Sequence, residues 1–589
     1  MQKASVISSS NYVGEDKFIW GKKYLLKLPN LDNDVVYGIV NKFNLSFPVA
    51  RVLCARGFVD ETQIQNYLFT QLAKDVSHPS KLKGSQVAAE RILSAIAKKE
   101  NILIFGDYDV DGITSTSLFL STLLPLGAKV NYFLPHRAKD GYGLSSKIVQ
   151  RAAQSGYKLI VTVDNGITAF DAAAQAKELG IDLIISDHHK PHKKLPVALS
   201  IVNPNQKDCS YPYKNLAGVG VIFKLISLIY EKKGLQLPQK AYELLMLGTV
   251  ADVVPLNGEN RFWVRHGLGK VNKQRSYSLD VLVQNARLNK AKLNSLDIGF
   301  MIAPQLNALG RLSDPRDAVK FLISSNRDDI EKIGRTLLEM NEARKQVERQ
   351  IYEEISYAIE EKKINIDKEN VIIAAAKNWP PGIIGLVAGK LVHNYGKPSF
   401  IFHILKDGTL RGSCRSIAKF DVFNALAENE DLLISFGGHS CAAGLCLKQE
   451  NLSKLKDRLE EKISKELTSY DLQLKISLDA ELDLLEVNKK LVDDLEMLEP
   501  FGQKNEQPIF LIKNVSLLKK PKLLKDKHVK CMLFSHGVIK PIIFFNRPDI
   551  FEVLAEIGNK SFDVAACVTT NEWNSKSSVE LRGLDVVLS

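Results

Sequence analysis

Short apolar segments alternate with segments of helical periodicity through the first half of the chain. The predicted strands are residues 101–105, 130–134, 159–163 and 182–186. Between them apolar residues recur every three or four positions, and glycine-rich or polar turns indicate helices that start near Ile113, Ser145 and Thr168. Connections of this length suit parallel strands joined through helices. The pattern therefore predicts an α/β domain built on a parallel sheet.

A different pattern begins at Ile330 and continues to about Glu361. Apolar residues stand three, four or seven positions apart among many charges, and no proline interrupts them. We predict one long amphipathic helix joining two lobes, because it exceeds the usual globular length of up to about 25 residues; an ordinary surface helix is the alternative. Segments 370–376, 398–402 and 436–444 then indicate a second, smaller α/β domain.

Beyond about residue 466 the helical signal fades, and short strand-like runs follow one another. Runs at this spacing predict a small antiparallel β-barrel. We expect five units. They are an N-terminal segment packed on the large α/β domain (residues 1–80), that domain itself (81–328), the connecting helix (329–362), the smaller α/β domain (363–465) and the β-rich domain (466–589).

Composition narrows the class of protein. Lys and Arg outnumber Asp and Glu by 79 to 67 in 589 residues, and this net charge of +12 favours a polyanionic partner, although many soluble proteins reach it without one. No apolar run is long enough to span a membrane, and the N-terminus lacks the apolar core of a signal peptide. The seven cysteines are scattered without CxxC spacing, which fits reduced thiols in a cytoplasm.

Acidic and histidine side chains follow several of the predicted strands. Asp107, Asp109 and Asp111 come after the first strand, Asp164 after the third, and Asp187, His188 and His189 after the fourth. The carboxyl ends of parallel strands converge on one crevice, so these groups are expected to share a small volume. Mutual repulsion there would raise their pKa values unless divalent cations neutralised them, and carboxylates with imidazoles suit Mn²⁺ or Mg²⁺.

Each of these segments also has a plainer interpretation. Alternating aspartates can form a solvated turn or a calcium loop, and a pair of histidines is often structural. Asp252 adds to the metal interpretation, because it lies in an apolar helix-to-loop context where an unpaired carboxylate would be costly. The convergence of four segments favours a metal site.

The motifs that carry this chemistry also resemble a known superfamily. GDYDVDGITST, TVDNGI, ISDHH and GTVADVVPL match, in order, the motifs of the DHH phosphoesterases, and FGGHSCAAG is similar to the associated DHHA1 domain. From about residue 45 onward, including PVARVLCARGFVD, LEPFGQKNEQPIF and TTNEWN, the chain resembles the RecJ family of bacterial single-strand-specific exonucleases. The β-rich end is similar to that family's oligonucleotide-binding (OB) barrel.

The resemblance implies a ligand set for two divalent cations, Mn²⁺ or Mg²⁺. Asp109 and Asp164 would hold one, and Asp111, Asp164, His188 and Asp252 the other, with Asp107 as a supporting or alternate ligand. His189 would contact the scissile phosphate or assist proton transfer. Arg311, in PQLNALGRLSD, would add positive charge, helped by Asn307.

Other residues are implied in binding DNA. The resemblance places Arg137, Arg411, Ser413, Arg415 and Ser416 around a terminal 5′-phosphate and brings His439 to the DNA backbone. Each arginine taken singly could be a surface charge. In the OB region, Lys519, Lys520, Lys522, Lys525 and Lys527, with neighbouring lysines and aromatic residues, could follow a strand or form a solvated hairpin.

Two positions depart from the family pattern. Phe105 stands where some relatives have a histidine, which would make the first metal site weaker or more dependent on water. Pro380 replaces a histidine after Trp379, so that histidine's role cannot be transferred, and we expect Trp379 to pack.

The resemblance implies a metal-dependent 5′ to 3′ exonuclease that releases 5′-mononucleotides from single-stranded DNA in repair and recombination. It also implies a cytoplasmic monomer whose partners include single-stranded DNA, a single-strand-binding protein and a RecQ-type helicase. No association with a membrane is expected. A short-oligonucleotide or cyclic-dinucleotide phosphodiesterase is the alternative, and an inactive DNA-binding scaffold is a more remote one. The extra β-domain argues against the phosphodiesterase, and the complete ligand set argues against the inactive scaffold.

Overall fold

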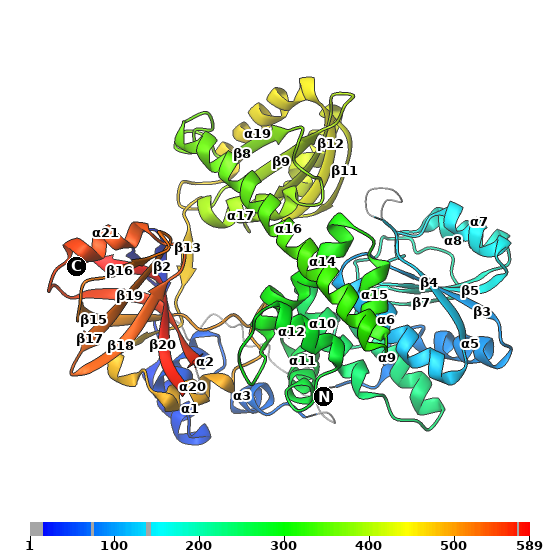
Figure 1. Ribbon diagram of the computed structural model, residues 1–589, viewed down its shortest axis with the longest axis horizontal. Helices are drawn as coiled ribbons and strands as arrows, with labels where there is room; N and C mark the ends of the chain where they lie inside the picture. The colour runs from blue at the N-terminus through cyan, green and yellow to red at the C-terminus, as the bar shows by residue number, and fades with distance from the viewer. Residues whose placement is uncertain (1–15, 72–75, 137–142, 574–575, 589) are drawn as a thin grey trace, which may run out of the picture.

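The computed structural model describes residues 16–71, 76–136, 143–573 and 576–588, which form three lobes (Figure 1). A large lobe, coloured from blue-cyan to green, carries helix α16 (Arg327–Glu360), which leads into a smaller lobe. A β-rich lobe contains the C-terminal strands. Helix α16 is 34 residues long and confirms the predicted connecting helix; Asn326 caps it by accepting from the amides of Asp328 and Asp329.

The large lobe is built on a five-stranded parallel sheet. Its strands, in spatial order, are β4 (Lys129–Phe133), β3 (Asn101–Gly106), β5 (Tyr157–Val163), β6 (Asp182–Ser186) and β7 (Ser200–Val202). Every neighbouring pair is parallel, which confirms the predicted α/β class. The four predicted strands are present, and β7 is an additional one. Because β3 lies between β4 and β5, the chain changes direction along the sheet at β3, and a crevice is expected at this point.

Helices cover both faces of this sheet. They are α5 (Ser85–Ala97), α6 (Val110–Leu123), α7 (Ser146–Gln154), α8 (Phe170–Glu178) and α9 (Gly218–Lys232). Ile102 and Ile104 pack with α5, α6 and α9, whereas Leu103 and Phe105 pack with α7 and α8. The alternation within β3 therefore buries both faces, as the continuous apolar strands require.

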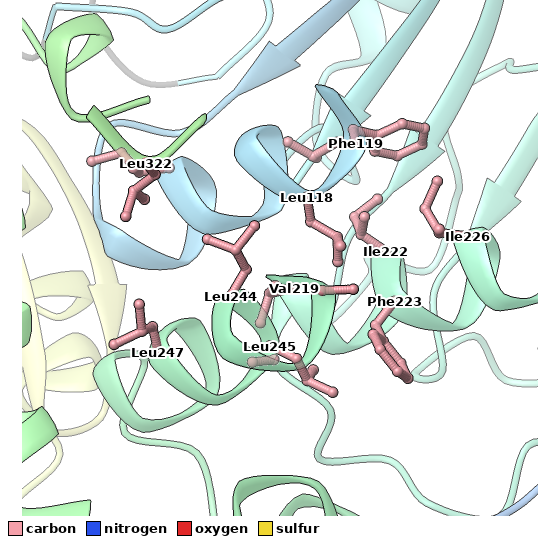
Figure 2. Close-up of a cluster of buried hydrophobic side chains, with 14 of the residues drawn as sticks. Leu118, Phe119, Val219, Ile222, Phe223, Ile226, Leu244, Leu245, Leu247 and Leu322 are labelled. Atoms are coloured by element: carbon pink, nitrogen blue, oxygen red, sulfur yellow. The ribbon is translucent and has the colours of Figure 1, made fainter. Parts of the chain in front are cut away.

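A helical layer extends the large lobe beyond the sheet. It contains α10 (Gln239–Ala251), α11 (Gly258–Val271), α12 (Tyr277–Asn285), α13 (Ser295–Asp297), η3 (Ile298–Ile302), α14 (Ala303–Leu312) and α15 (Arg316–Ile323). Figure 2 shows Leu118 of α6, Val219 of α9 and Leu244 of α10 in the common core of these helices. No helix in the described part of the chain is long and apolar enough to cross a bilayer.

Two helices begin away from their predicted starts. Helix α6 begins at Val110, three residues before Ile113, because the Asp109 side chain caps it by accepting from the Gly112 amide at 3.1 Å. Helix α8 begins at Phe170 instead of Thr168. The early start of α6 places the second and third aspartates of the motif at a helix N-terminus.

The smaller lobe holds a five-stranded mixed sheet. Its spatial order is β11 (Leu433–His439), β12 (Ala442–Lys448), β10 (Thr409–Arg415), β9 (Ser399–Ile404) and β8 (Ile372–Ala376), and its helices are α17 (Ile384–Tyr395), α18 (Val422–Ala427) and α19 (Leu452–Glu466). Only β8 and β9 pair in parallel among the described strands of this sheet. This confirms the predicted smaller α/β domain.

In the C-terminal lobe, five strands close into a ring. These are β15 (Phe510–Leu517), β19 (Phe562–Trp573), β20 (Lys576–Leu588), β18 (Val538–Phe544) and β17 (His528–Ser535), with β14 (Ala480–Leu482) and β16 (Lys522–Leu524) attached. Pairing of β15 with β17 completes the ring. Helices α20 (Lys489–Glu496) and α21 (Asp549–Glu556) pack against this β-domain.

The N-terminal elements join this lobe, which corrects one expectation. Strands β1 (Lys17–Trp20) and β2 (Leu25–Leu28) form a sheet with β13 (Lys475–Ser477), and helices α1 (Asn33–Phe43), α2 (Phe47–Ala55) and α3 (Glu61–Leu68) share one apolar core with the β-domain. Residues 1–80 are expected on the large α/β domain; α1 and α2 pack on the β-domain instead, whereas the end of α3 contacts both lobes, because the Tyr67 and Leu68 carbonyls accept from Arg261 and Arg265 of α11. The amphipathic periodicity of α1–α3 predicts a buried face but does not identify the surface that buries it.

Candidate metal centre

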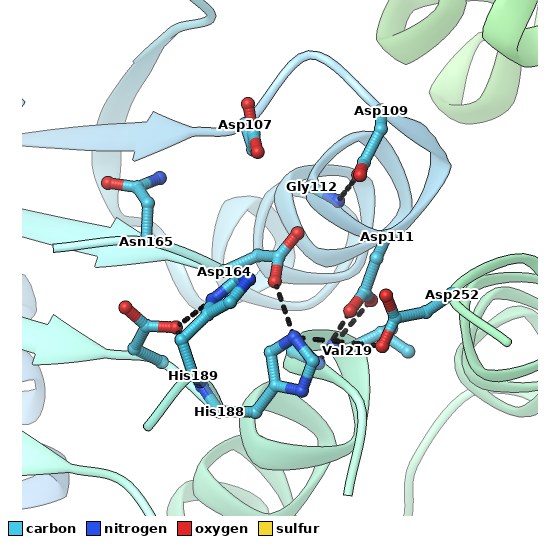
Figure 3. Close-up of polar contacts among 12 residues, drawn as sticks. Asp107, Asp109, Asp111, Gly112, Asp164, Asn165, His188, His189, Val219 and Asp252 are labelled. Atoms are coloured by element: carbon cyan, nitrogen blue, oxygen red, sulfur yellow. Dashed lines mark hydrogen bonds and ion pairs between the residues drawn. The ribbon is translucent and has the colours of Figure 1, made fainter. Parts of the chain in front are cut away.

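The aspartates meet where β3 and β5 end, beside the crossover point of the sheet (Figure 3). Asp107 follows β3 and is 5% exposed, and Asp164 follows β5 and is 2% exposed. Asp164 has a left-handed backbone conformation, with φ 63°, which is uncommon for a residue other than glycine. Such a conformation is frequently retained at functional sites.

Asp111 connects two helices that are distant in sequence. It lies in the first turn of α6, and its two carboxylate oxygens accept hydrogen bonds from the Gly218 and Val219 amides at the start of α9, at 2.6 and 2.7 Å. Burial, followed by repulsion from Asp109, raises the pKa of Asp111 to about 7. The ionised form of this carboxyl group is therefore disfavoured in the folded protein, and a bound cation would offset that free-energy cost.

His188 faces two further carboxylates. Its Nε2 lies 3.2 Å from Oδ1 of Asp164 and 3.6 Å from Oδ2 of Asp252, the residue that ends α10. These three atoms are buried, and none of them makes a hydrogen bond of good geometry to another described residue. Burial first, and then the neighbouring aspartates, raise the pKa values of Asp164 and Asp252 well above the ordinary range.

The two adjacent histidines have opposite protonation states. Burial lowers the pKa of His188 to about 4, so its imidazole is neutral and has a lone pair for a metal. Burial also opposes charge on His189, but the hydrogen bond of its Nδ1 to Asp187, at 2.7 Å, outweighs this effect and raises its pKa to about 9. Asp187 also accepts from the amides of Ile167, His188 and His189, so it holds the backbone of both histidines and orients the His189 ring.

Three groups of side chains have ligand atoms close enough to hold a cation. Within each group the atoms lie within 4.8 Å of one another, and the groups are Asp107, Asp109 and Asp164; Asp111, His188 and Asp252; and Asp164, His188 and His189. Oxygen-rich sets with imidazole suit Mn²⁺ or Mg²⁺. Together with the buried atoms that lack hydrogen bonds, this donor chemistry fits divalent cations, and Asp164 belongs to two of the groups.

Two supporting asparagines were missed by sequence reasoning. The Asn203 side chain donates to the His189 carbonyl at 2.9 Å, and the Asn205 side chain donates to the His188 carbonyl at 2.6 Å. Both follow β7, the short strand that was not predicted. The polar NPN run after this strand is the signal that could have revealed them.

Helix α14 connects the metal centre with the smaller lobe. Oδ1 of Asn307 accepts from the Val110 amide at 3.1 Å, so Asn307 supports the start of α6. One turn later, Arg311 donates from Nη1 to the Gly382 carbonyl at 2.8 Å, just before α17. Both residues therefore lie between the aspartates and the second lobe.

The residues expected to bind a terminal phosphate lie on β10 and around it. Ser413 and Arg415 face the first turn of α17, where a Cβ added to Gly385 would approach the Ser413 Oγ to 2.8 Å. The Ser416 hydroxyl donates to the Phe420 carbonyl, Arg411 is exposed on the same strand, and His439 is exposed at the end of β11. Arg137 lies outside the described residues.

The expected lysines surround the β16–β17 hairpin. Lys519, Lys520, Lys522, Lys525 and Lys527 are all exposed, and within the described chain none of them has an ion pair. Phe534 on β17 is 38% exposed. This surface can approach a polyanion without first breaking internal contacts.

The two departures from the family pattern are both accommodated by packing. Phe105 is fully buried and stacks on Phe133, with ring centroids 5.8 Å apart, so its side chain lies in the core. Trp379 is 5% exposed and donates from Nε1 to Glu354 on α16. The Pro380 carbonyl accepts from the Ile383 amide in the turn that enters α17.

A parallel sheet with this cluster at its carboxyl edge defines a metal-dependent α/β enzyme of the DHH class. The DHH family, N-terminal domain, matches residues 101–249, the DHHA1 domain residues 368–465 and the RecJ OB domain residues 478–585. The single-stranded-DNA-specific exonuclease RecJ of Bacillus subtilis (strain 168) is 34% identical over 560 residues, covering 95% of this chain and 70% of that protein. The chain belongs to the RecJ family.

Other relatives and solved structures agree with this assignment. RecJ of Escherichia coli (strain K12) is 33% identical over 476 residues, covering 77% of this chain and 82% of that protein. The crystal structure of RecJ from Thermus thermophilus in complex with Mn²⁺ has a TM-score of 0.78 at 25% identity, over 94% of this chain and 78% of that chain. An exonuclease RecJ bound to manganese has a TM-score of 0.58 at 30% identity, over 66% of this chain and 98% of that one.

Proposed function

We propose that the chain is a metal-dependent exonuclease that degrades single-stranded DNA from its 5′ end and releases 5′-mononucleotides, in DNA repair and recombination. The observation that carries this proposal is the convergence of carboxylates and imidazole at one sheet edge, with buried ligand atoms that lack hydrogen bonds. Its expected metal ligands are Asp109, Asp111, Asp164, His188 and Asp252. An inactive scaffold would have no use for this costly cluster.

The candidate ligands divide into two neighbouring sets. Asp107, Asp109 and Asp164 would hold one cation, and Asp111, His188 and Asp252 would hold the other, with Asp164 contacting both. Bound Mn²⁺ or Mg²⁺ supplies charge neutralisation and activates water for phosphodiester hydrolysis. The protein fixes the ligands beforehand: the Gly218 and Val219 amides hold Asp111, and Asn205 holds the His188 backbone.

His189 is suited to act on the phosphodiester directly. Asp187 binds its Nδ1, which leaves Nε2 to carry a proton toward the phosphate, and the pKa of about 9 keeps the ring protonated at neutral pH. A cationic donor at this place stabilises the charge that develops on phosphate oxygens and can protonate the departing oxygen. Arg311 adds positive charge from α14.

The 5′ end is bound between β10 and α17 in this proposal. Ser413 and Arg415 offer a hydroxyl and a guanidinium, and Gly385 lets the first turn of the helix approach them closely. Guanidinium groups and helix N-termini are both good partners for phosphate. Arg137, Ser416 and His439 complete the proposed DNA contacts, and the exposed lysines of the β16–β17 hairpin bind the strand further along.

A strand labelled at either end tests this function. Wild-type protein should release the 5′ label first as a mononucleotide in Mn²⁺ and release nothing in chelator, and His188→Ala should be inactive in both. Release from the 3′ end would contradict the polarity, and activity in chelator would contradict the metal centre. Faster hydrolysis of dinucleotides than of long strands would instead favour the phosphodiesterase alternative.

Proposed partners follow from the substrate. Single strands in a cell are produced by helicases and coated by other proteins, so a single-strand-binding protein and a RecQ-type helicase are proposed partners of a cytoplasmic monomer. Light scattering of the purified protein tests the monomer, and co-purification with each candidate tests the partners.

A further inference from the structure

A second potential ligand site lies away from the metal centre. It is a groove of about 720 Å³ between the end of α3 and helices α10 and α11. Gln239, the first residue of α10, lines the groove, whereas Asp252 caps the other end of the same helix. At 1.5 Å per residue these two points are about 20 Å apart, so the groove does not belong to the metal site.

The groove is uniformly basic. Arg265, Lys270 and Lys273 line it, and among its described lining residues none is acidic. None of these three cations forms an ion pair within the described chain. Arg265 donates from Nη1 to the Leu68 carbonyl at 2.8 Å, which fixes the guanidinium and leaves its other N–H groups for a ligand.

Aromatic rings accompany the cations. Phe262 and His266, one helical turn apart, have ring centroids 5.9 Å apart and planes only 11° from parallel. Phe69, at the end of α3, is 48% exposed and lines the same groove. Gly269, which follows His266 on α11, has no side chain, and a Cβ added there would meet nothing within 4 Å. The groove thus has room beside flat aromatic surfaces.

We propose that this groove binds a nucleotide unit of single-stranded DNA, with the phosphate on the cations and the base against the rings. Basic grooves with exposed aromatic side chains bind single strands in this way, and the volume suits a ligand of nucleotide size. The inference rests on the proposed function, since a second contact about 20 Å from the metal centre would retain the strand during its degradation. An acidic peptide would use the cations but gain less from parallel rings.

Binding in chelator separates this site from catalysis. Fluorescence anisotropy of a labelled strand of about 30 nucleotides should show about tenfold weaker binding for Lys270→Glu/Lys273→Glu, with the salt slope reduced by about two. The control Lys129→Glu/Lys177→Glu makes the same charge change at two exposed lysines, one at the start of β4 and one in the last turn of α8, and should bind like wild type. Phe69→Ala should weaken binding about fivefold or more.

Short substrates distinguish a failure of this inference from a failure of the proposed function. The Lys270→Glu/Lys273→Glu variant should hydrolyse a 5′-phosphorylated dinucleotide as fast as wild type, because the metal centre is intact. Equal strand binding by this variant and wild type would overturn the inference even if both degrade DNA. Displacement of the strand by a free deoxynucleoside monophosphate would support the nucleotide chemistry, whereas loss of acidic-peptide binding without loss of strand binding would overturn it.

Discussion

At the scale of single residues, the metal centre depends on buried atoms that have no hydrogen-bond partner among the described residues. Oδ2 of Asp252 and Nε2 of His188 are buried 3.6 Å apart, and neither has a hydrogen bond within the part of the chain that the structure describes. A bound cation would satisfy both, whereas the metal-free protein leaves them uncompensated.

Asp252→Asn tests this view of the centre. Mn²⁺ at about 100 times the dissociation constant should raise the free energy of unfolding of the wild type by about 2.7 kcal/mol, because only the folded state holds the ion. The variant should gain less than about half of this, as it loses a charged ligand. Thermal unfolding with and without Mn²⁺ measures the gain; Asp171→Asn, in the exposed first turn of α8, should keep it in full. Equal gains in both variants would exclude Asp252 as a ligand.

The raised carboxyl pKa values make the metal-free protein sensitive to pH. Asp111, Asp164 and Asp252 have folded-state pKa values above the ordinary 3.8, so between about pH 4 and 7 the folded protein binds more protons than the unfolded chain. Their contribution to stability is present at low pH and is lost as pH rises. His188 acts in the opposite direction, since its pKa is lowered to about 4, but it is one group against three.

We therefore expect the stabilisation by Mn²⁺ to grow as pH rises from about 5 to 7. Melting temperatures in Mn²⁺ and in chelator, measured across this range, give the difference directly. Asp252→Asn should flatten the dependence because it removes one of the titrating carboxyls. If the stabilisation of the wild type by Mn²⁺ stays constant with pH, the result would contradict the raised pKa values of these carboxyl groups.

At the scale of elements, the packing of helix α17 on strand β10 shapes the proposed end-binding site. The first turn of α17 approaches Ser413 and Arg415 at Gly385. A glycine is needed there for close approach, because an added Cβ would lie 2.8 Å from the Ser413 Oγ and 3.2 Å from the Arg415 Nη2.

Gly385→Val should displace both polar groups from the proposed phosphate pocket. We expect KM for a 5′-phosphorylated strand to rise about tenfold, the loss of one charge-assisted contact, with little change in kcat. Gly389→Ala is the matched control on the same helix, since its Cβ would only approach the Arg415 Cγ at 3.9 Å. Steady-state kinetics on strands with and without the 5′-phosphate make the comparison; a KM that rises equally for both strands would argue against end recognition at this site.

At the scale of the whole molecule, Arg261 of α11 connects three parts of the chain. Its buried guanidinium donates to the carbonyls of Tyr67, Met497 and Leu498, and lies over the Tyr67 ring at 4.0 Å. Burial lowers its pKa to about 10, so it remains protonated at neutral pH. The large lobe is thereby joined to α3 and to the C-terminal lobe.

Arg261→Ala should loosen this junction. It removes one donor from each of three carbonyls, although Leu498 still accepts from Tyr67 and Asn505. We expect the free energy of the first unfolding transition to fall by about 3 kcal/mol, with the C-terminal lobe unfolding separately. Arg151→Ala, on the exposed side of α7, should change stability by no more than about 0.5 kcal/mol. Thermal unfolding by calorimetry and denaturant unfolding by fluorescence measure the stability of both variants. If Arg261→Ala keeps coincident transitions at wild-type stability, the junction lies elsewhere.

The sequence by itself determined the local pattern and its direct consequences. Alternating strands and helices fix a parallel sheet, and acids placed after strands meet at one edge whatever the distant contacts are, so Asp107, Asp164 and His188 could be predicted together. The tertiary structure alone decided which partners complete them. The amides that hold Asp111 come from α9, more than a hundred residues away, and α1–α3 bury their apolar faces on the C-terminal lobe. Amphipathic periodicity predicts that one face of a helix is buried, but long-range packing determines which surface buries it.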